Sequence, residues 1–485
     1  MLEFAESPWE AELLEKYLKY LRGGGPAGTD TPEGPPAAGS PPPGAPQEKT
    51  VETVGLPGGE VVTHLRDIET SGARRQTEQL RQKFVSRRPI LDRAQHIVGY
   101  EMLLRKKSPS TPKADEGALQ PIYDETLIRC VADLQIDRLL AGKLAFVGVS
   151  PATLDSPLLL KLPKQGMVLA VQPDPAQADR ILTRCKELKL LGYRVALDDV
   201  TDVRQAEPFL ETVAFVRIDV SKLNAIALGK LVDLIVGKSA VQLIANNVET
   251  DEDFEACRRM YFHYFEGYYF ARLQPAAPHR IDSNRARVMQ LLNMVRHRGE
   301  ISELEQVFRR DAVLTYKLLR YINAPVNGLL QEIRSIAHAL IILGHDQLYR
   351  WLTLLLFTSG AMEPRAQALL KNALVRARLT ELLGWDKVAP AEREGLFIVG
   401  IFSQLDVLLN VPMERALEEL HLPEQVAQAL VRRVGVYAPF LELAAACEDA
   451  DQERIARYAE LCGMDAATVN RLHGEALVWA EEIEQ

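Results

Sequence analysis

The sequence predicts a protein that is part α/β and part all-α, with a (β/α) barrel followed by a helical domain. From residue 84 to about 273, short apolar runs typical of strands alternate with amphipathic stretches, which indicates βαβ units and a parallel sheet. From about residue 282, strand-like runs nearly disappear and helical runs follow one another. The 485 residues, of which 47% are hydrophobic and 25% charged, suit a soluble chain with at least two cores.

Composition and charge exclude several classes of protein. The net charge of −9 argues against binding to nucleic acid, because phosphate backbones attract cationic surfaces. Five scattered cysteines form neither a CxxC pair nor a Cys/His metal spacing, which indicates reduced thiols. The N-terminus lacks the features of a signal peptide, and the apolar stretches 351–357 and 395–411 are too short or too polar to span a bilayer. We therefore expect a cytoplasmic protein without a membrane span.

Residues 1–22 are expected to form an amphipathic helix that a linker separates from the rest of the chain. Residues 23–82 are the linker and lead-in, and their Gly/Pro-rich part, up to about residue 60, cannot bury enough apolar surface to offset its ordering entropy. The helix either packs on its own protein or serves as a docking arm for a partner. Its apolar face, with residues at helical spacing, consists of Trp9, Leu13, Leu14, Tyr17, Leu18 and Leu21.

The barrel domain is placed at residues 83–280. Amphipathic helices separate most of its strands, for example at 126–140, 176–191 and 251–261. Polar residues gather at the carboxyl ends of the strands, where an α/β barrel holds its chemistry. The first two strands are close enough to form a hairpin, so the barrel is not expected to be fully regular. The strand candidates are 84–91, 97–104, 145–150, 167–171, 194–199, 215–220, 242–248 and 264–270.

The helical domain is placed at residues 281–485. Gly344, Pro364, Pro390 and Pro412 punctuate its periodic runs, since glycine and proline end or break helices. The sequence shows no repeat of fixed period. The expected helices are 283–298, 301–311, 312–323, 335–343, 346–357, 365–383, 391–409, 423–434, 438–448, 451–462 and 465–484.

Three acidic residues lie at the ends of strand-like runs in the barrel. Glu101 is in the second strand, and Asp198 and Asp199 close the fifth. Carboxylate oxygens are the ligands that Mg²⁺, Mn²⁺ and Ca²⁺ prefer, so the three could form a metal site. Acidic pairs of this kind are also common as solvated turn residues or helix caps.

The barrel domain resembles the EAL family of cyclic di-GMP phosphodiesterases over about residues 84–273. The family is a two-metal enzyme, and the resemblance implies that Glu101, Asp198 and Asp199 match metal ligands, with Glu249 in the same pocket. It also implies that Arg105 matches a phosphate contact, a role that Arg217 could share. The resemblance rests on SRRPILD at 86–92, VGYEMLLR at 98–105, ALDD at 196–199, RID at 217–219, ANNVET at 245–250 and EGYYF at 266–270.

Several positions depart from the family pattern. Gly148 stands where an Asn ligand is expected, Ala170 where a Glu ligand is expected, and Asn246 where the family has a Glu. Arg217 replaces a Lys, Glu266 replaces a Gln, and VTDV at 200–203 replaces a glycine-rich loop. Because two-metal chemistry needs a full ligand shell, we expect no catalytic residue and no bound metal or cofactor. The remaining carboxylates are compatible only with weak binding of Mg²⁺ or Mn²⁺.

The helical domain resembles the HDOD domain, a non-catalytic relative of the HD phosphohydrolases. The matching segments are 308–323, 333–344 and GLF at 395–397, with Ser403, Leu405 and Leu408 further along. His345-Asp346 spells the metal-binding dipeptide of true HD hydrolases, but it follows a helix break and no other histidines cluster with it. We therefore expect a helix cap at Asp346 and a solvated His345.

Together the two resemblances indicate an EAL–HDOD bacterial signalling protein. We expect a non-catalytic scaffold or adaptor that acts through protein–protein contacts, with protein partners that the sequence does not identify. Two alternatives remain: a cyclic di-GMP receptor without turnover, and a residual phosphodiesterase in which Glu266 and Asp202 supply replacement ligands. Binding of cyclic di-GMP is thus an alternative rather than the expectation, and assembly into a homo-oligomer is left open.

Overall fold

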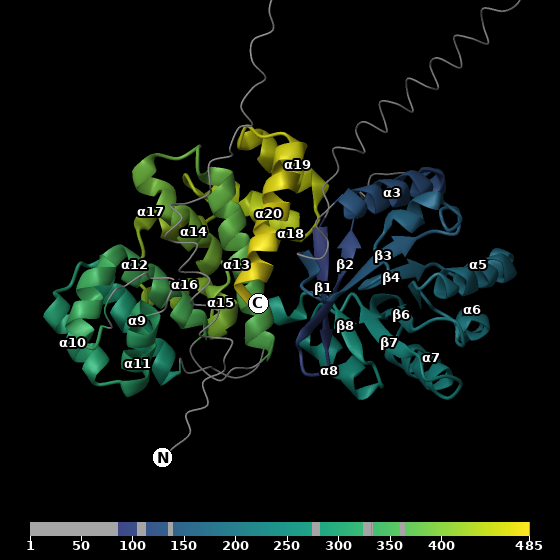
Figure 1. Ribbon diagram of the computed structural model, residues 1–485, viewed down its shortest axis with the longest axis horizontal. Coiled ribbons are helices and arrows are strands. Elements are labelled where there is room, and N and C mark those ends of the chain that lie inside the picture. The colour runs from purple at the N-terminus through teal and green to yellow at the C-terminus, as the bar shows by residue number, and fades with distance from the viewer. Residues whose placement is uncertain are drawn as a thin grey trace, which may run out of the picture.

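The computed structural model describes residues 86–103, 113–133, 139–273, 282–323, 331, 333–358 and 364–484. A closed barrel of eight strands comes first, and the residues described after it are helical or irregular (Figure 1). The predicted fold class is therefore confirmed. The strands are β1 (Ser86–Asp92), β2 (Ile97–Leu103), β3 (Leu144–Val149), β4 (Met167–Val171), β5 (Arg194–Leu197), β6 (Phe215–Asp219), β7 (Gln242–Asn246) and β8 (Tyr264–Glu266).

The barrel is irregular at its first strand, as the close spacing of the first two strands predicted. β1 runs antiparallel to both of its neighbours, β2 and β8, whereas the other neighbouring strands are parallel. The register of the β1–β2 hairpin places Arg88 opposite Glu101. The helices of the barrel domain, which lie around the strands (Figure 1), are α3 (Lys113–Asp133), α5 (Ala178–Leu190), α6 (Val203–Ala206), α7 (Ala225–Val236) and α8 (Asp251–Arg259).

The last strand is shorter than predicted, because a glycine turns the chain away. β8 ends at Glu266, and Gly267 follows with a φ of 152°. A Cβ atom at this position would collide with the carbonyl oxygen of Val248, so the close approach of the two backbones requires glycine.

An apolar cluster and a row of polar residues share the barrel interior. Side chains on one face of a strand recur every second residue. In β6 and β7, Phe215 and Ile244 of the apolar cluster are therefore followed by Arg217 and Asn246, one step nearer the carboxyl ends of the strands. This order places the polar groups where barrels carry their sites. The cluster consists of Ile90, Phe146, Val168, Ala170, Ala196, Phe215 and Ile244.

The helical domain differs from its predicted elements at three places, the first of which is the unpredicted short helix α16. The predicted helices 335–343 and 346–357 form one kinked helix, α12, with Gly344 at φ 67° and ψ 173°. The predicted helix 391–409 is interrupted at Ser403 and Gln404, which leaves α14 and α15. The helices are α9 (Ser283–Arg296), α10 (Ile301–Arg309), α11 (Ala312–Ile322), α12 (Ile336–Thr358), α13 (Pro364–Gly384), α14 (Arg393–Phe402), α15 (Leu405–Leu409), α16 (Met413–Glu418), α17 (Glu424–Val431), α18 (Ala438–Glu448), α19 (Gln452–Leu461) and α20 (Ala466–Glu484).

The two domains meet where α13, α18 and α20 lie beside the β1–β2 hairpin (Figure 1). The fully buried carboxylate of Glu481, on α20, is the centre of an ion cluster at this interface. It accepts a hydrogen bond from the Tyr100 hydroxyl (2.7 Å) and lies 2.9 Å from Arg87 Nη1. Lys371 Nζ, on α13, approaches it to 2.5 Å and Lys143 Nζ to 3.1 Å. Three cations from both domains therefore surround one carboxylate.

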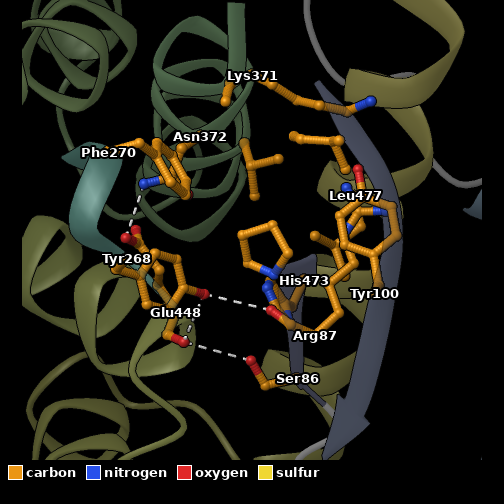
Figure 2. A pocket seen from close by; sticks show the side chains of 14 residues that line it. Ser86, Arg87, Tyr100, Tyr268, Phe270, Lys371, Asn372, Glu448, His473 and Leu477 are labelled. Atoms are coloured by element: carbon orange, nitrogen blue, oxygen red, sulfur yellow. Dashed lines mark hydrogen bonds between the residues drawn. The ribbon is translucent and has the colours of Figure 1, made fainter. Parts of the chain in front are cut away.

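Hydrogen bonds from side chains to backbone carbonyl oxygens, beside this cluster, join the same two domains. The Ser86 hydroxyl donates to the Cys447 carbonyl oxygen (3.0 Å), and the Tyr268 hydroxyl donates to that of Glu448 (3.3 Å). Figure 2 shows these side chains around a small cavity of about 40 Å³. Its walls come from β1, β2, α13 and α20, so it belongs to the domain interface.

Two sets of predicted residues lie outside the described part of the chain. They are the apolar face of residues 1–22 and the phosphate contact Arg105. Within the described part, no helix combines the length and the apolar character needed to cross a membrane. The five cysteines form no disulfide.

Candidate functional site

Arg217 occupies the centre of the polar layer at the carboxyl ends of the barrel strands. It belongs to β6 and is 1% exposed. Its Nη2 donates to Glu101 Oε1 on β2 (2.5 Å) and to Glu266 Oε2 on β8 (2.7 Å). Its Nη1 lies 3.2 Å from Asp198 Oδ1, directly after β5. One guanidinium group thus connects three carboxylates that come from three strands.

Asn246 and Arg88 complete the surroundings of this guanidinium. With the amide oriented to satisfy its neighbours, Asn246 donates to Glu266 Oε2 (3.1 Å) and accepts from Arg217 Nε (3.2 Å). Arg88, on β1, donates from Nη1 to Glu266 Oε1 (2.9 Å). Glu266 therefore has a cation at each of its two oxygens, which is the pairing that a buried carboxylate requires.

A third cation, Lys222, pairs with the carboxylates in the outer part of the site. Lys222 Nζ lies 2.5 and 2.7 Å from the two oxygens of Asp199 and 3.6 Å from Asp219 Oδ2. Asp199 has a φ of 54°, a left-handed conformation that Asp tolerates better than most residues. The Lys222 and Asp199 side chains are 48% and 39% exposed, so this pair forms the solvent-accessible rim of the site.

The pKa values of the inner carboxylates diverge. Burial raises the pKa of Glu101 to about 7, and Glu266 and Asp198 add to the rise while Arg217 opposes it. Burial also raises the pKa of Asp198, again against Arg217. Burial favours the neutral form of Glu266 as well, but Arg217 and Arg88 outweigh it and hold the pKa of Glu266 below its ordinary value. The ionic interactions of the site therefore centre on Arg217 and Glu266.

The structure brings together only part of the predicted site. Glu101, Asp198 and Glu266 meet at Arg217, whereas the Glu249 carboxylate pairs with Arg272 and has no contact with that group.

Three other predicted positions contribute no side chain to the cluster of carboxylates around Arg217. Gly148 and Ala170 stand opposite each other in β3 and β4 and have no side-chain oxygen. Asp202, a replacement ligand in the residual-enzyme alternative, caps α6 and pairs with Arg204.

Sequence reasoning missed two members of the site, Arg88 and Lys222. A signal existed for each. Arg88 lies two residues before Ile90 in β1, and Lys222 follows Asp219 by three residues after a strand end. Neither signal indicates a partner, because the partners lie on other strands.

The arrangement offers ion pairs rather than open ligand positions. Among the described residues, no group of three or more His, Cys, Asp or Glu side chains is placed to hold a metal ion. Catalytic metal sites keep an open position for water, whereas here the carboxylates of the inner group face Arg217. In this structure the inner carboxylates are therefore engaged in ion pairs with Arg217 rather than grouped around an open ligand position.

The HD dipeptide of the helical domain differs from its predicted environment. His345 is half-buried rather than solvated, and its Nε2 lies 3.1 Å from the Gly299 carbonyl oxygen. Within the described residues, Asp346 forms no cap hydrogen bond. Elsewhere in the domain, the ring centroid of His297 lies 5.6 Å from that of His421.

Comparison with protein families identifies both domains. The EAL domain family matches residues 75–273, and the HDOD domain family matches residues 281–427. The chain carries an EAL domain followed by an HDOD domain. The architecture inferred from the two resemblances is thus confirmed, and the polar layer around Arg217 lies in the EAL domain.

Two relatives align with most of this EAL–HDOD chain. Cyclic di-GMP phosphodiesterase CdgJ of Vibrio cholerae is 29% identical over 409 residues, covering 82% of this chain and 93% of the relative. The uncharacterized protein YuxH of Bacillus subtilis is 26% identical over 407 residues, covering 82% and 98%. Among solved structures, the FimX EAL domain of Pseudomonas aeruginosa bound to c-di-GMP aligns with 44% of this chain and 95% of its own, at 21% identity and a TM-score of 0.31.

Proposed function

We propose that this chain is a non-catalytic component of cyclic di-GMP signalling, in which an EAL domain without turnover and an HDOD domain act through protein contacts. The similarity to CdgJ over 93% of that relative supports the link to this signalling class. The position of Arg217 supports the absence of turnover and carries the proposal.

The argument from Arg217 is electrostatic. A two-metal hydrolase uses carboxylates to hold cations that activate water and stabilise the leaving oxygen. Here Glu101 and Glu266 are hydrogen-bonded to Arg217, and Asp198 lies 3.2 Å from it. A guanidinium neutralises this charge permanently, since it does not deprotonate in proteins, and it has no exchangeable water to activate. Metal entry would require Arg217 to leave a fully buried position.

The role of protein contacts is supported by apolar side chains on the HDOD domain. Helices α11 and α12 pack against each other, and each exposes large apolar residues. Surfaces of this kind commonly mark sites of protein–protein interaction. The residues are Val313 and Tyr316 on α11 and Ile341 and Ile342 on α12.

Hydrolysis measurements test the proposal directly. Full-length protein is incubated with cyclic di-GMP and Mg²⁺ or Mn²⁺, and we expect no linear product above the rate of a Glu101→Ala variant. Turnover that the Glu101→Ala substitution abolishes would show that the residual-enzyme alternative is correct.

Calorimetry separates the receptor alternative from the scaffold. Titration of cyclic di-GMP into the full chain, with and without Mn²⁺, is expected to give no saturable heat. Saturable binding without hydrolysis would make the chain a receptor, and the lower affinity of a Lys222→Gln variant would then place the nucleotide at the rim of the barrel.

A further inference from the structure

A pocket in the HDOD domain, away from the barrel, combines an apolar floor with a cationic edge. It has a volume of about 210 Å³ and lies between the end of α9, the second half of α12, α14 and α17. Val295, Ile398 and Val426 are its buried apolar residues. Small-molecule sites characteristically join such a floor to a few polar groups.

The charges at the pocket edge do not balance. Arg350 pairs with Glu394 at 2.8 Å. Arg296 and Arg298 also line the pocket, and neither pairs with a carboxylate in the part of the chain that the structure describes. Asp346 is the remaining acid of the lining, so the arginines exceed the acids by one.

The backbone of Arg298 has a left-handed conformation that is strained for any residue with a Cβ atom. Arg298 follows the last turn of α9 with a φ of 51°. Its N–H donates to the Val295 carbonyl oxygen (3.0 Å), and the next N–H, of Gly299, donates to that of Met294 (2.8 Å). This is the Schellman arrangement, whose left-handed residue is usually glycine because a Cβ is strained there. Here arginine stands at that position, directly before a glycine.

His345 fixes the same turn to the opposite wall. Gly344 has a φ of 67° and interrupts α12 with a kink. A residue with a Cβ atom would adopt this left-handed backbone conformation only at an energetic cost. His345 then reaches the Gly299 carbonyl oxygen with Nε2 (3.1 Å). Two walls of the pocket therefore turn at left-handed residues, Arg298 and Gly344, and one contact joins the turn that carries Arg298 to α12.

We propose that this pocket binds a small phosphorylated ligand, whose phosphate dianion lies between Arg296 and Arg298. Guanidinium groups offer paired N–H donors that match phosphate oxygens. A phosphate dianion pairs with both guanidinium groups. The free energy of this binding offsets the backbone strain at Arg298. The volume is smaller than the roughly 300–1,000 Å³ of most sites for drug-sized ligands, so the body attached to the phosphate has only a few heavy atoms.

Calorimetry on the full chain tests the proposal with inorganic phosphate and methyl phosphate as probes, and acetate as the monoanion control. We expect saturable binding of both phosphates and much weaker binding of acetate. Arg298→Gly and Arg296→Gln should each weaken phosphate binding by about tenfold or more, the size expected for a lost charge-assisted hydrogen bond. Asp346→Asn should strengthen it, because an acid is removed from the lining.

Arg298→Gly also separates a binding role from a structural one. Glycine relieves the left-handed strain, so the variant should lose phosphate affinity while its melting temperature rises. The matched control is Arg309→Gln on α10, an exposed arginine paired with Glu305, which should bind phosphate like the wild type. The proposal is overturned by a wild type without saturable binding, by equal losses in Arg309→Gln and Arg298→Gly, or by an Arg298→Gly variant that keeps its affinity.

Discussion

Arg87 and Arg88 are adjacent in β1, yet their guanidinium groups belong to two separate ion clusters. Arg87 Nη1 lies 2.9 Å from Glu481 at the interface between the EAL and HDOD domains. Arg88 Nη1 lies 2.9 Å from Glu266 inside the barrel. Successive side chains of a strand point to opposite faces, so one strand connects the candidate site with the second domain.

β2 shows the same division. The Tyr100 hydroxyl donates to Glu481 (2.7 Å), and the next residue, Glu101, accepts from Arg217 (2.5 Å). The β1–β2 hairpin therefore contributes two residues to each cluster. A shift of this hairpin would displace both clusters together, which gives the EAL domain a physical connection to the HDOD domain.

The first prediction concerns the interface carboxylate. Glu481→Gln leaves the cations Arg87, Lys143 and Lys371 around a neutral amide. Removing one partner from a buried ion pair costs about 3–5 kcal/mol, and we expect a loss of this size in the free energy of unfolding. Denaturant titration followed by tryptophan fluorescence measures it, because Trp479 lies two residues before Glu481 on α20.

The control for this variant is Glu460→Gln, an exposed position on α19. It should change the unfolding free energy by less than about 0.5 kcal/mol. If the two variants unfolded at the same denaturant concentration, the ion cluster would not hold the domains together.

The second prediction is a dependence on acid. Burial alone would raise the pKa of Glu481, but Arg87, Lys371 and Lys143 outweigh burial and lower it from 4.5 to about 2. A carboxyl with a lowered pKa stabilises the folded chain above its unfolded pKa and loses this effect as the pH falls through its folded pKa. The shift corresponds to about 3 kcal/mol, lost between pH 4.5 and about 2.

Urea unfolding at a series of pH values measures this loss. The wild type should lose stability more steeply than Glu481→Gln below pH 4.5, until the two curves converge near pH 2. Parallel curves over this range would show that Glu481 titrates alike in the folded and unfolded chains.

The sequence predicted the barrel more completely than it predicted the site. Buried strands such as β4 are continuous apolar runs, and the β1–β2 hairpin follows from its short connection, so local patterns sufficed for both. The sequence presented Arg217 and Glu266 as two separate departures from a family pattern. Their hydrogen bond joins positions 49 residues apart, and only the closed barrel brings β6 and β8 to one centre.

The interface was beyond the reach of local patterns for the same reason. Tyr100 and Glu481 are separated by 381 residues, and an acidic residue near the end of an amphipathic helix normally indicates a solvated face. Burial of Glu481 depends on how two domains dock, which no periodicity within α20 reveals.

The third prediction tests whether Arg217 takes the place of a metal ion. Arg217→Ala leaves Glu101, Asp198 and Glu266 facing one another, and we expect a loss of about 3–5 kcal/mol in the unfolding free energy. Three carboxylates of which only Glu266 still has a cation, Arg88, suit a hard divalent ion. Mn²⁺ should therefore raise the melting temperature of Arg217→Ala, and EDTA should reverse the rise.

The wild type and Arg258→Ala are the controls for this experiment. Arg258 forms an exposed pair with Glu255, so its loss should have little effect on stability. Neither protein should respond to Mn²⁺ in the melting experiment. An equal response in the wild type would mean that the carboxylates hold a metal despite Arg217.

The last prediction concerns the two family ligands that are absent from β3 and β4. A Cβ atom on Gly148 would meet no atom within 4 Å, whereas Ala170 is fully buried in the apolar cluster with Phe146 and Phe215. Gly148→Asn should therefore change the unfolding free energy by about 1 kcal/mol or less. Ala170→Glu should cost about 3 kcal/mol or more, because it adds both volume and an unpaired charge to a packed interior.

Ala170→Gln distinguishes these two contributions in thermal and urea unfolding, since it has the volume of Glu without the charge. A smaller loss in Ala170→Gln than in Ala170→Glu at neutral pH would assign the difference to the charge. If Ala170→Glu were instead as stable as the wild type, Arg217 would be able to turn and pair with the new carboxylate. In that case the barrel would have room for a further acidic side chain at position 170, paired with Arg217.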